Sequence, residues 1–439
     1  MQNFGCRATQ ADGAAMERQL LAKGLLKSDS ASHADLVVLN TCTVTASADQ
    51  DARAAIRKIN RENPGAKILV TGCYAQRAPQ EVAALDGVTW VLGNSHKHLV
   101  AEIATSQTSR DFVSLEAVAL SAPAFTLIGD IFAHTELIAA PVFTGDDIAG
   151  KTRPNLKVQD GCNNRCSFCI IPSVRGQSRS MKLERVIAEA YALVEAGYRE
   201  IVLSGINLGR WGRDFQPQMR FEQLLRALLE RTGIEKVRIS SVEPMDWGDE
   251  LIALVAGSSR IARHAHLPLQ SGSDAILRGM HRKYRPWHYA EKIRKIHEAM
   301  PGAAIGADVM VGFPGETDAL FEESRSFIEC LPFTYLHVFT YSSRPGTASA
   351  AMPGQVPVNV ARERNRVLRE LAAAKNLEFR KKFVGKTLDV ITLQTGDEDS
   401  TEALSDNYLK VRVAGSHRAN ELILATITNL EMDHLVGRI

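Results

Sequence analysis

Short apolar runs alternate with amphipathic stretches over the first hundred residues. Three of these runs have the length and the β-branched content of buried strands: residues 35–40, 66–72 and 88–94. Between the first two, residues 47–63 place apolar side chains at a helical period. Strands that alternate with helices at this spacing predict βαβ units, so we expect an N-terminal parallel-sheet α/β domain over residues 1–104.

The same alternation returns, more regularly, in the middle of the chain. Residues 105–153 have no clear period, and we expect a linker or peripheral segment there. Six further strands are then predicted at 156–161, 200–207, 236–244, 264–272, 305–315 and 335–342. With amphipathic helices between them, six β/α repeats predict a partial (β/α)6 barrel over residues 154–380, with its chemistry at the carboxyl ends of the strands.

The last eighty residues change character twice. Residues 356–386 read as a basic helical stretch with three glutamates and nine cationic residues: Arg362, Arg364, Arg366, Arg369, Lys375, Arg380, Lys381, Lys382 and Lys386. After Gly385, short β-prone runs separated by turn residues predict a small all-β barrel over 381–439. The predicted fold class is therefore α/β and multidomain, closed by an all-β module.

Composition narrows the class of protein only a little. A chain of 439 residues is expected to form two or three domains, and 45% hydrophobic with 23% charged residues is ordinary for a globular protein. The net charge of +2 permits a nucleic-acid partner without requiring one. The residues after Met1 lack the apolar core of a signal peptide, and no apolar run has the length of a membrane span, so we expect a cytoplasmic protein and no membrane partner.

Three of the seven cysteines lie within eight positions, in the sequence GCNNRCSFC. Cys162, Cys166 and Cys169 have the spacing C-x3-C-x2-C, which is not that of a structural zinc site. Three thiolates can hold a cubane iron–sulfur cluster and leave one iron without a protein ligand. The alternative is a structural metal loop completed by a distant cysteine. An odd number of cysteines also argues against a disulfide framework.

A second cysteine set is spread along the chain. Cys42 and Cys73 each follow a predicted strand, and Cys6 would follow one too, although only five residues precede it. We therefore expect the first strand to be absent or to lie upstream of Met1. Carboxyl ends of parallel strands share one edge of a sheet, so the three thiols can converge there. The alternative is that they are small buried hydrophobes, which is also our expectation for Cys330.

The sequence GCNNRCSFCIIPSVRGQSRS, residues 161–180, closely resembles the signature of the radical S-adenosylmethionine methylthiotransferase family. The resemblance extends over almost the whole chain. The segments around Cys6, Cys42 and Cys73 resemble that family's N-terminal domain, and the closing β module resembles its RNA-binding TRAM domain. The motifs NTCTVT, SSVEP, HLPLQSGSD and YLHVFTYSSRPGT resemble the branch that acts on N6-threonylcarbamoyladenosine in tRNA.

The resemblance implies a cofactor set and a reaction. One [4Fe–4S] cluster on Cys162, Cys166 and Cys169 would bind S-adenosylmethionine at its open iron and yield a 5′-deoxyadenosyl radical. A second [4Fe–4S] cluster, held by the other three cysteines, would carry the sulfur that is methylated and transferred to C2 of adenine. The implied partners are the anticodon stem-loop of tRNA and a low-potential electron donor such as flavodoxin or ferredoxin. The sequence does not identify the sulfur donor.

Further candidates follow barrel strands or the cysteine loop. Gly205, Asn207, Glu243 and Gln270 are candidate contacts of S-adenosylmethionine, with plain turns or surface contacts as the alternative. Residues 311–317 resemble the family's adenine-side loop, although a glycine- and proline-rich turn explains them equally well.

The sequence leaves the role of three other groups of polar residues undecided. Arg175 and Arg179 suit a substrate phosphate or carboxylate, with a solvated salt bridge as the alternative. His264 and His266 point to one side of a strand, where packing or hydrogen bonding is favoured over metal binding. Arg380, Lys381, Lys382 and Lys386 are candidate RNA contacts, with a solvated helix face as the alternative.

Three functions are compatible with these residues. The first is a methylthiotransferase acting on threonylcarbamoyladenosine 3′-adjacent to the anticodon. The second keeps the chemistry but changes the target to isopentenyladenosine in tRNA or to a ribosomal-protein aspartate. The third is a non-catalytic RNA-binding iron–sulfur protein.

Overall fold

The computed structural model describes residues 1–106, 124–133, 152–397 and 399–439. The chain divides into two compact units, one made of residues 1–141, 159–180 and 342–350 and the other of the remainder. Each is described by itself. Among the described residues, no helix combines the length and the apolar character that crossing a membrane requires.

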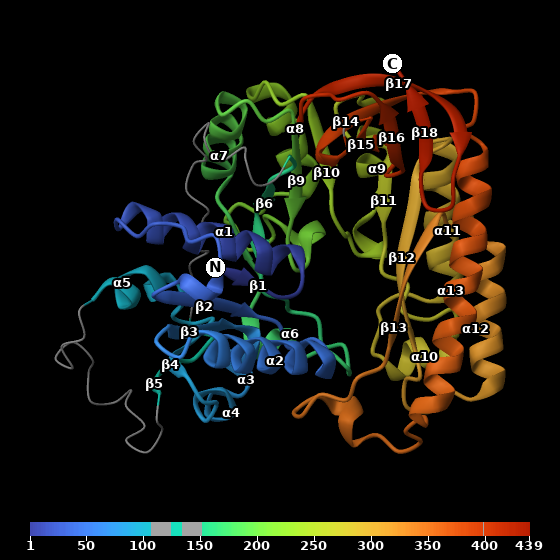
Figure 1. Cartoon of the computed structure of the whole chain (residues 1–439). Helices are drawn as coiled ribbons and strands as arrows, with labels where there is room; N and C mark the ends of the chain where they lie inside the picture. Colours follow the sequence, from blue (N-terminus) through green and yellow to red (C-terminus); the bar gives the residue numbers. More distant parts are fainter. Residues whose placement is uncertain (107–123, 134–151, 398) are drawn as a thin grey trace. The chain divides into compact units, whose positions relative to one another are not determined.

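The first unit is built on a parallel sheet of five strands in the order β1 to β5. Its strands are β1 (Gln2–Asn3), β2 (Leu36–Thr41), β3 (Lys67–Gly72), β4 (Val88–Gly93) and β5 (Phe125–Leu127). Its longer helices are α1 (Arg7–Ala22), α2 (Ala46–Glu62), α3 (Cys73–Arg77), α4 (Pro79–Ala83) and α5 (Val100–Thr105). The predicted N-terminal α/β domain is thus present as a sheet with helices on both sides (Figure 1).

Each face of this sheet has its own apolar core, because alternate residues of a strand point to opposite faces. Val38 and Leu69 pack with Met16 of α1 and Val100 of α5. On the other face, Leu39, Ile68 and their neighbours pack with side chains of α2, α3 and α4.

Two strands correct the sequence analysis. β1 precedes Cys6 and pairs in parallel with β2. Our expectation that the strand before the first cysteine is absent or lies upstream of Met1 was therefore wrong. β5 lies within 105–153, where we expected a linker or peripheral segment, and it pairs in parallel with β4. Both strands are too short, at two and three residues, to give a periodic signal.

The second unit contains the six predicted barrel strands. They are β6 (Asn155–Lys157), β9 (Glu200–Ser204), β10 (Lys236–Ile239), β11 (His264–His266), β12 (Ala304–Val311) and β13 (Tyr335–Thr340). All neighbouring pairs are parallel, and bridges from Val237 to Ile261 and from Ser241 to His266 join the two halves. Among the described strands β6 and β13 do not pair, so the barrel is open, as predicted.

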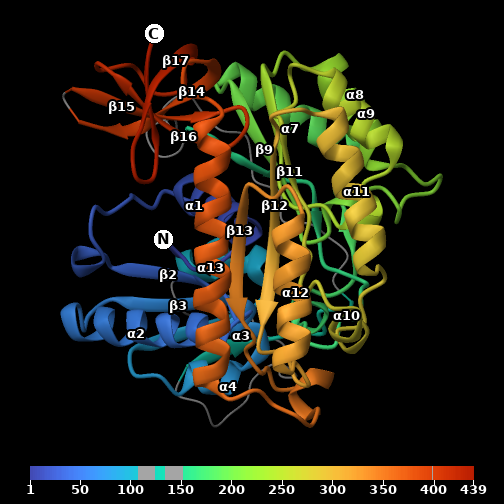
Figure 2. The same cartoon turned by 90° about the vertical axis from the view of Figure 1, so that its right-hand side faces the viewer.

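Helices cover the outside of this barrel. They are α7 (Leu183–Glu195), α8 (Phe221–Arg231), α9 (Asp249–Gly257), α10 (Asp274–Gly279), α11 (Pro286–Ala299), α12 (Asp318–Cys330) and α13 (Val358–Lys381). Figure 2 shows α11, α12 and α13 side by side in front of β12 and β13. Ile293, Ile328 and Leu368 on these helices are fully buried, as are Ile305 and Val309 of β12.

The C-terminal residues form a closed five-stranded barrel in the order β14-β15-β16-β18-β17. Its strands are β14 (Thr387–Gly396), β15 (Ser400–Ser405), β16 (Lys410–Ala414), β17 (Leu422–Leu430) and β18 (Leu435–Arg438). Closure leaves no unpaired edge. Phe379 and Phe383, at the end of α13, enter its core, and buried Arg238 of β10 donates hydrogen bonds to the carbonyls of Ser405 and Asp406.

Candidate functional site

The segment that carries Cys162, Cys166 and Cys169 is closed at its base by a short antiparallel pair, β7 (Gln159–Asp160) with β8 (Arg179–Ser180). Gly161 has a φ of 69°, and a Cβ there would lie 1.9 Å from the carbonyl oxygen of Gln177. Glycine is therefore required at this crossing. The Cys162 amide donates to the carbonyl of Gly176 at 3.1 Å, which fixes the first cysteine against the end of the loop.

All three thiols of this loop are half-buried, so they are held by the fold yet remain open to a ligand. The Cys169 amide donates to the carbonyl of Cys166 at 3.1 Å, which folds the C-x2-C half into a turn. The Asn164 amide points at the sulfur of Cys162 at 3.4 Å, an arrangement that stabilises a thiolate. Soft, anionic sulfur ligands in a compact loop fit an iron–sulfur cluster.

The second cysteine set is assembled from three strand ends. Cys6 follows β1, Cys42 follows β2, and Cys73 begins α3 directly after β3. Gly5 has a φ of 103°, and a Cβ there would lie 2.5 Å from the Cβ of Cys42 and 2.8 Å from its sulfur. The chain before Cys6 therefore runs directly against Cys42. Cys6, Cys42 and Cys73 thus follow three neighbouring strands of one parallel sheet.

The electrostatics of this set favour a bound cationic group. Burial, together with the nearby sulfurs of Cys73 and Cys6, raises the pKa of the Cys42 thiol to about 12, although a backbone hydrogen bond and Arg175 lower it. Thiols placed together in a buried site resist ionisation unless a metal neutralises them. The site thus fits a second iron–sulfur cluster.

An ion-pair network beside this set was not foreseen from the sequence. Arg175, on α6 (Ile171–Arg175), is buried and donates hydrogen bonds to Asp160 at 2.9 Å, to Asp12 at 3.2 Å and to Thr9 at 3.2 Å. Lys97 pairs with Asp12 at 2.7 Å. Burial opposes the charge of Arg175, but Asp160 and Cys73 raise the pKa of its guanidinium well above the usual value.

This network answers the open question about the arginines after the cysteine loop. Arg175 forms salt bridges, but these are buried and not the solvated pair that was the alternative to a substrate contact. Arg179 donates to the carbonyls of Arg175 and Gln177, so it holds the loop's own backbone.

Direct packing also links the two cysteine sets inside the first unit. Cys73 shares an apolar cluster with Ile170 and Val174, which follow the cysteine loop. Asn94 donates to the sulfur of Cys73 at 3.4 Å and to the carbonyl of Val174 at 2.8 Å. All seven cysteines lie in the described residues, and none is in a disulfide. The seventh, Cys330, is exposed at the end of α12, so our expectation that it is buried was wrong.

The other candidate contacts of S-adenosylmethionine lie after barrel strands of the second unit. Gly205 and Asn207 follow β9, and Asn207 is buried. Glu243 follows β10 and forms an ion pair with Arg282. Gln270 has a φ of 65°, a left-handed conformation that is uncommon for a residue with a side chain and is often found at functional sites.

Residues 311–317 form a turn, which was one of the two structures that we considered for this segment. Glu316 accepts a hydrogen bond from the Gly312 amide at 2.7 Å and one from Arg364 at 2.8 Å. Burial raises the pKa of Glu316, and these bonds lower it. The turn is therefore held by an internal ion pair to α13.

The predicted basic surface on α13 is smaller than expected. Several cationic side chains of this helix, Arg364 among them, bind partners within the protein. Arg380 is 6% exposed and donates to the carbonyls of Glu431 and Met432 at 2.8 Å each. Arg380 therefore anchors the end of α13 to the closed barrel, and our prediction that it contacts RNA was wrong. Lys381, Lys382 and Lys386 are exposed, and Lys381 pairs with Glu378 at 2.7 Å.

Comparisons with known proteins bear on both units. The family model described as the radical SAM superfamily matches residues 156–328, and that of the uncharacterized protein family UPF0004 matches residues 1–93. The radical S-adenosylmethionine methyltransferase TsrM from Kitasatospora setae, a solved structure, superposes with a TM-score of 0.57 at 17% identity, covering 72% of this chain and 66% of that one. This likeness confirms the fold.

Two relatives resemble almost the full length of the chain. The threonylcarbamoyladenosine tRNA methylthiotransferase MtaB of Bacillus subtilis is 38% identical over 419 residues, which cover 94% of this chain and 89% of the relative. The tRNA-2-methylthio-N(6)-dimethylallyladenosine synthase of Saccharopolyspora erythraea is 32% identical over 452 residues, 100% of this chain and 89% of the relative. The chain belongs to the radical S-adenosylmethionine methylthiotransferase family, in the branch of the threonylcarbamoyladenosine tRNA methylthiotransferases.

Proposed function

We propose that this protein adds a methylthio group to C2 of N6-threonylcarbamoyladenosine next to the anticodon of tRNA. The observation that carries the proposal is the presence of two incomplete thiol sites in one unit, within a chain that matches tRNA methylthiotransferases over nearly its full length. The enzyme uses two [4Fe–4S] clusters and S-adenosylmethionine. With tRNA as its substrate, we expect it in the cytoplasm.

We assign the two cluster sites by residue. Cys162, Cys166 and Cys169 hold the cluster that binds S-adenosylmethionine, and Cys6, Cys42 and Cys73 hold the second one. When bound, the first cluster supplies the electron that cleaves S-adenosylmethionine to a radical, and the second supplies a site for the sulfur. The chain's own groups position these thiolates: Gly161 and Gly5 allow the close approaches, and Arg175 and Asn94 face the sulfurs of the second site.

Mass spectrometry of tRNA nucleosides tests the substrate. A strain that lacks this gene should lose 2-methylthio-N6-threonylcarbamoyladenosine and accumulate the unmethylthiolated nucleoside, and the intact gene should restore it. Loss of the methylthio form of isopentenyladenosine instead would assign the protein to the alternative branch. Unchanged tRNA together with an unmodified ribosomal-protein aspartate would indicate the protein substrate.

A second assay separates the enzyme from a non-catalytic iron–sulfur protein. The reduced protein with both clusters should form 5′-deoxyadenosine from S-adenosylmethionine, with flavodoxin or ferredoxin as the expected class of electron donor. A protein that binds RNA and retains both clusters but forms no 5′-deoxyadenosine would contradict catalysis.

We assign RNA contact to the exposed lysines at the junction of α13 and the closed barrel. Lys381, Lys382 and Lys386 project there beside a small β-barrel, a fold that commonly binds oligonucleotides. Replacing Lys381 and Lys382 together by Glu should weaken tRNA binding and reduce the slope of log K against log salt by about 1 to 2. Exposed Lys58 of α2 offers a control for charge reversal. An unchanged salt dependence would exclude this surface.

A further inference from the structure

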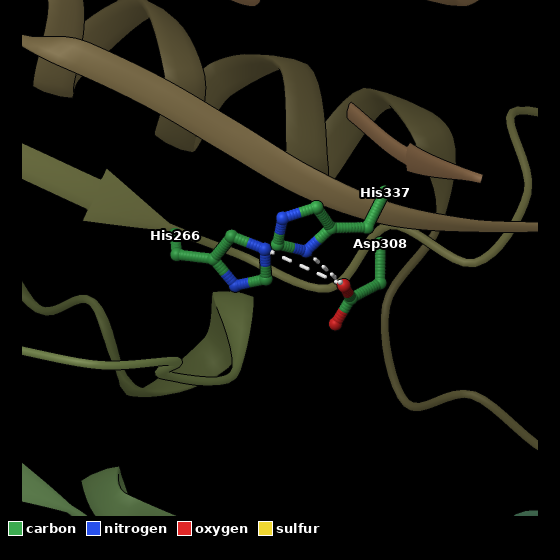
Figure 3. Close-up of side chains that lie close together, drawn as sticks. All are labelled: His266, Asp308 and His337. Atoms are coloured by element: carbon green, nitrogen blue, oxygen red, sulfur yellow. Dashed lines mark hydrogen bonds and ion pairs between the residues drawn. The ribbon is translucent and has the colours of Figure 1, made fainter. Parts of the chain in front are cut away.

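Polar side chains line one face of three neighbouring barrel strands. The register pairs Gly306 of β12 with His266 of β11 and with Tyr335 of β13, and it pairs Asp308 with His337. Successive residues of a strand alternate between faces, so His266, Asp308 and His337 come from three strands onto the same face. Figure 3 shows the three side chains converging.

Two of the three distances among the possible ligand atoms match those of ligands around one metal ion. Nδ1 of His337 lies 3.2 Å from Oδ1 of Asp308, and Nε2 of His266 lies 3.4 Å from the same oxygen. All three ligand atoms lie within 4.8 Å of one another. Two ligands on a tetrahedral zinc ion, with bonds of about 2.0–2.1 Å, are about 3.3 Å apart. Both measured distances agree with this separation.

His266 is oriented as a metal ligand. Its Nδ1 lies 3.0 Å from the hydroxyl of Ser241, which leaves Nε2 directed at Asp308. The residue is 6% exposed, and its Nε2 lies 3.4 Å from Oδ1 of Asp308 without the geometry of a hydrogen bond. A histidine that binds metal through one nitrogen usually has the other nitrogen held by a partner such as Ser241. The buried Nε2 therefore points into the cluster, and its one contact there is with another proposed ligand.

The cluster also contains an oxygen ligand and is accessible. Oδ1 of Asp308 faces both imidazoles, and a carboxylate oxygen is a ligand that zinc accepts. His337 is half exposed, which gives an ion a path into the site.

We propose that His266, Asp308 and His337 bind one divalent transition-metal ion, for which zinc is the best match. Two imidazoles and one carboxylate are ligands that zinc accepts, and three protein ligands leave a fourth position for water or a substrate oxygen. This site is separate from the six cysteines and does not depend on the proposed tRNA activity. The preference for packing or hydrogen bonding at His266 agrees with its burial and its contact with Ser241. The sequence contained no sign of a shared site, because Asp308 and His337 lie far from His266 along the chain.

Zinc binding to the full-length protein with both clusters loaded tests the proposal. Cluster loading occupies the six cysteines, so zinc should then be retained at one ion per chain after equilibrium dialysis. X-ray absorption at the zinc edge should show nitrogen and oxygen at about 2.0–2.1 Å and no sulfur at about 2.3 Å. His337→Ala should lower zinc affinity by more than the roughly 10- to 100-fold expected for Ser241→Ala, which removes only a supporting partner.

Two controls make the result decisive. His297 is an exposed histidine of α11, so His297→Ala should retain zinc with unchanged affinity. Asp308→Asn keeps the shape of the side chain while removing its charge, and it should also lose zinc. Absence of zinc from the wild-type protein, a sulfur shell around the ion, or equal affinity of wild type and His337→Ala would each overturn the proposal.

Discussion

The two cysteine sets are built in opposite ways. Cys162, Cys166 and Cys169 lie on one short loop, and all three are half-buried. Cys6, Cys42 and Cys73 come from three separate strand ends, and the last two are buried. The first set needs only a local turn, whereas the second exists only when the whole parallel sheet has formed. Binding at the second set is therefore coupled to the fold of the domain.

Cysteine replacements give the largest effect and test whether the two sets are independent. Cys166→Ala should remove about four of about eight irons and abolish both 5′-deoxyadenosine and methylthio product. Cys42→Ala should also lose about four irons and the methylthio product but still form 5′-deoxyadenosine. Cys330→Ala is the matched control, because this cysteine is exposed on α12 and should retain all irons. Loss of 5′-deoxyadenosine formation in Cys42→Ala would show that the sets depend on each other.

A glycine replacement affects only the set assembled by the fold. Gly5→Ala places a Cβ 2.5 Å from that of Cys42, so we expect loss of about four irons per chain with the loop cluster retained. Gly24 is the matched control. It also has a positive φ, 89°, but a Cβ there meets nothing within 4 Å, so Gly24→Ala should cost only about 1 kcal/mol and no iron. Equal iron content in the two variants would contradict the close approach at Gly5.

Residues near in sequence were predicted better than residues that meet only in the fold. The C-x3-C-x2-C spacing is visible directly, and the three dispersed thiols could be predicted because strand ends of a parallel sheet share an edge. Asp12, Lys97 and Arg175 gave no such signal, since their network depends on tertiary packing. Without coordinates, a buried arginine cannot be distinguished from an exposed one.

The ends of the barrel strands were also harder to predict than their positions. The strand predicted at 264–272 was too long, because β11 ends at His266. The following residues remain apolar and buried, but the chain leaves the strand and Gln270 adopts a left-handed conformation. Burial and periodicity therefore gave the strand's position, whereas backbone geometry decided where it stops. Arg380 of α13 shows a different limit. Its neighbours in sequence are those of a surface cation, but it is buried and donates hydrogen bonds to two backbone carbonyls.

Replacing Arg175 tests the connection between the two cysteine sets, and we expect an effect of intermediate size on stability. Arg175 donates to Asp160 at the base of the cysteine loop and to Asp12 of α1. Arg175→Met removes one of the cations that neutralise these buried carboxylates, so we expect a loss of about 3 kcal/mol in the free energy of unfolding, measured by denaturant titration. Lys27→Met removes an exposed pair with Glu17 and should cost less than about 1 kcal/mol. Equal losses would contradict a structural role for the buried network.

The smallest expected effect is a pH dependence that distinguishes the buried set from the loop. In the cluster-free protein, the folded state holds the Cys42 pKa at about 12, above the 9.0 of an ordinary thiol. Between these two values the unfolded chain releases its proton and the folded chain keeps it, so ionisation favours unfolding. The free energy of unfolding should therefore fall as pH rises above about 9, by up to about 1.4 kcal/mol per pH unit from this group. Cys42→Ser cannot ionise there, and its stability should fall less steeply over the same range. Parallel curves for the two proteins would show that the Cys42 thiol is not held protonated by the folded sheet.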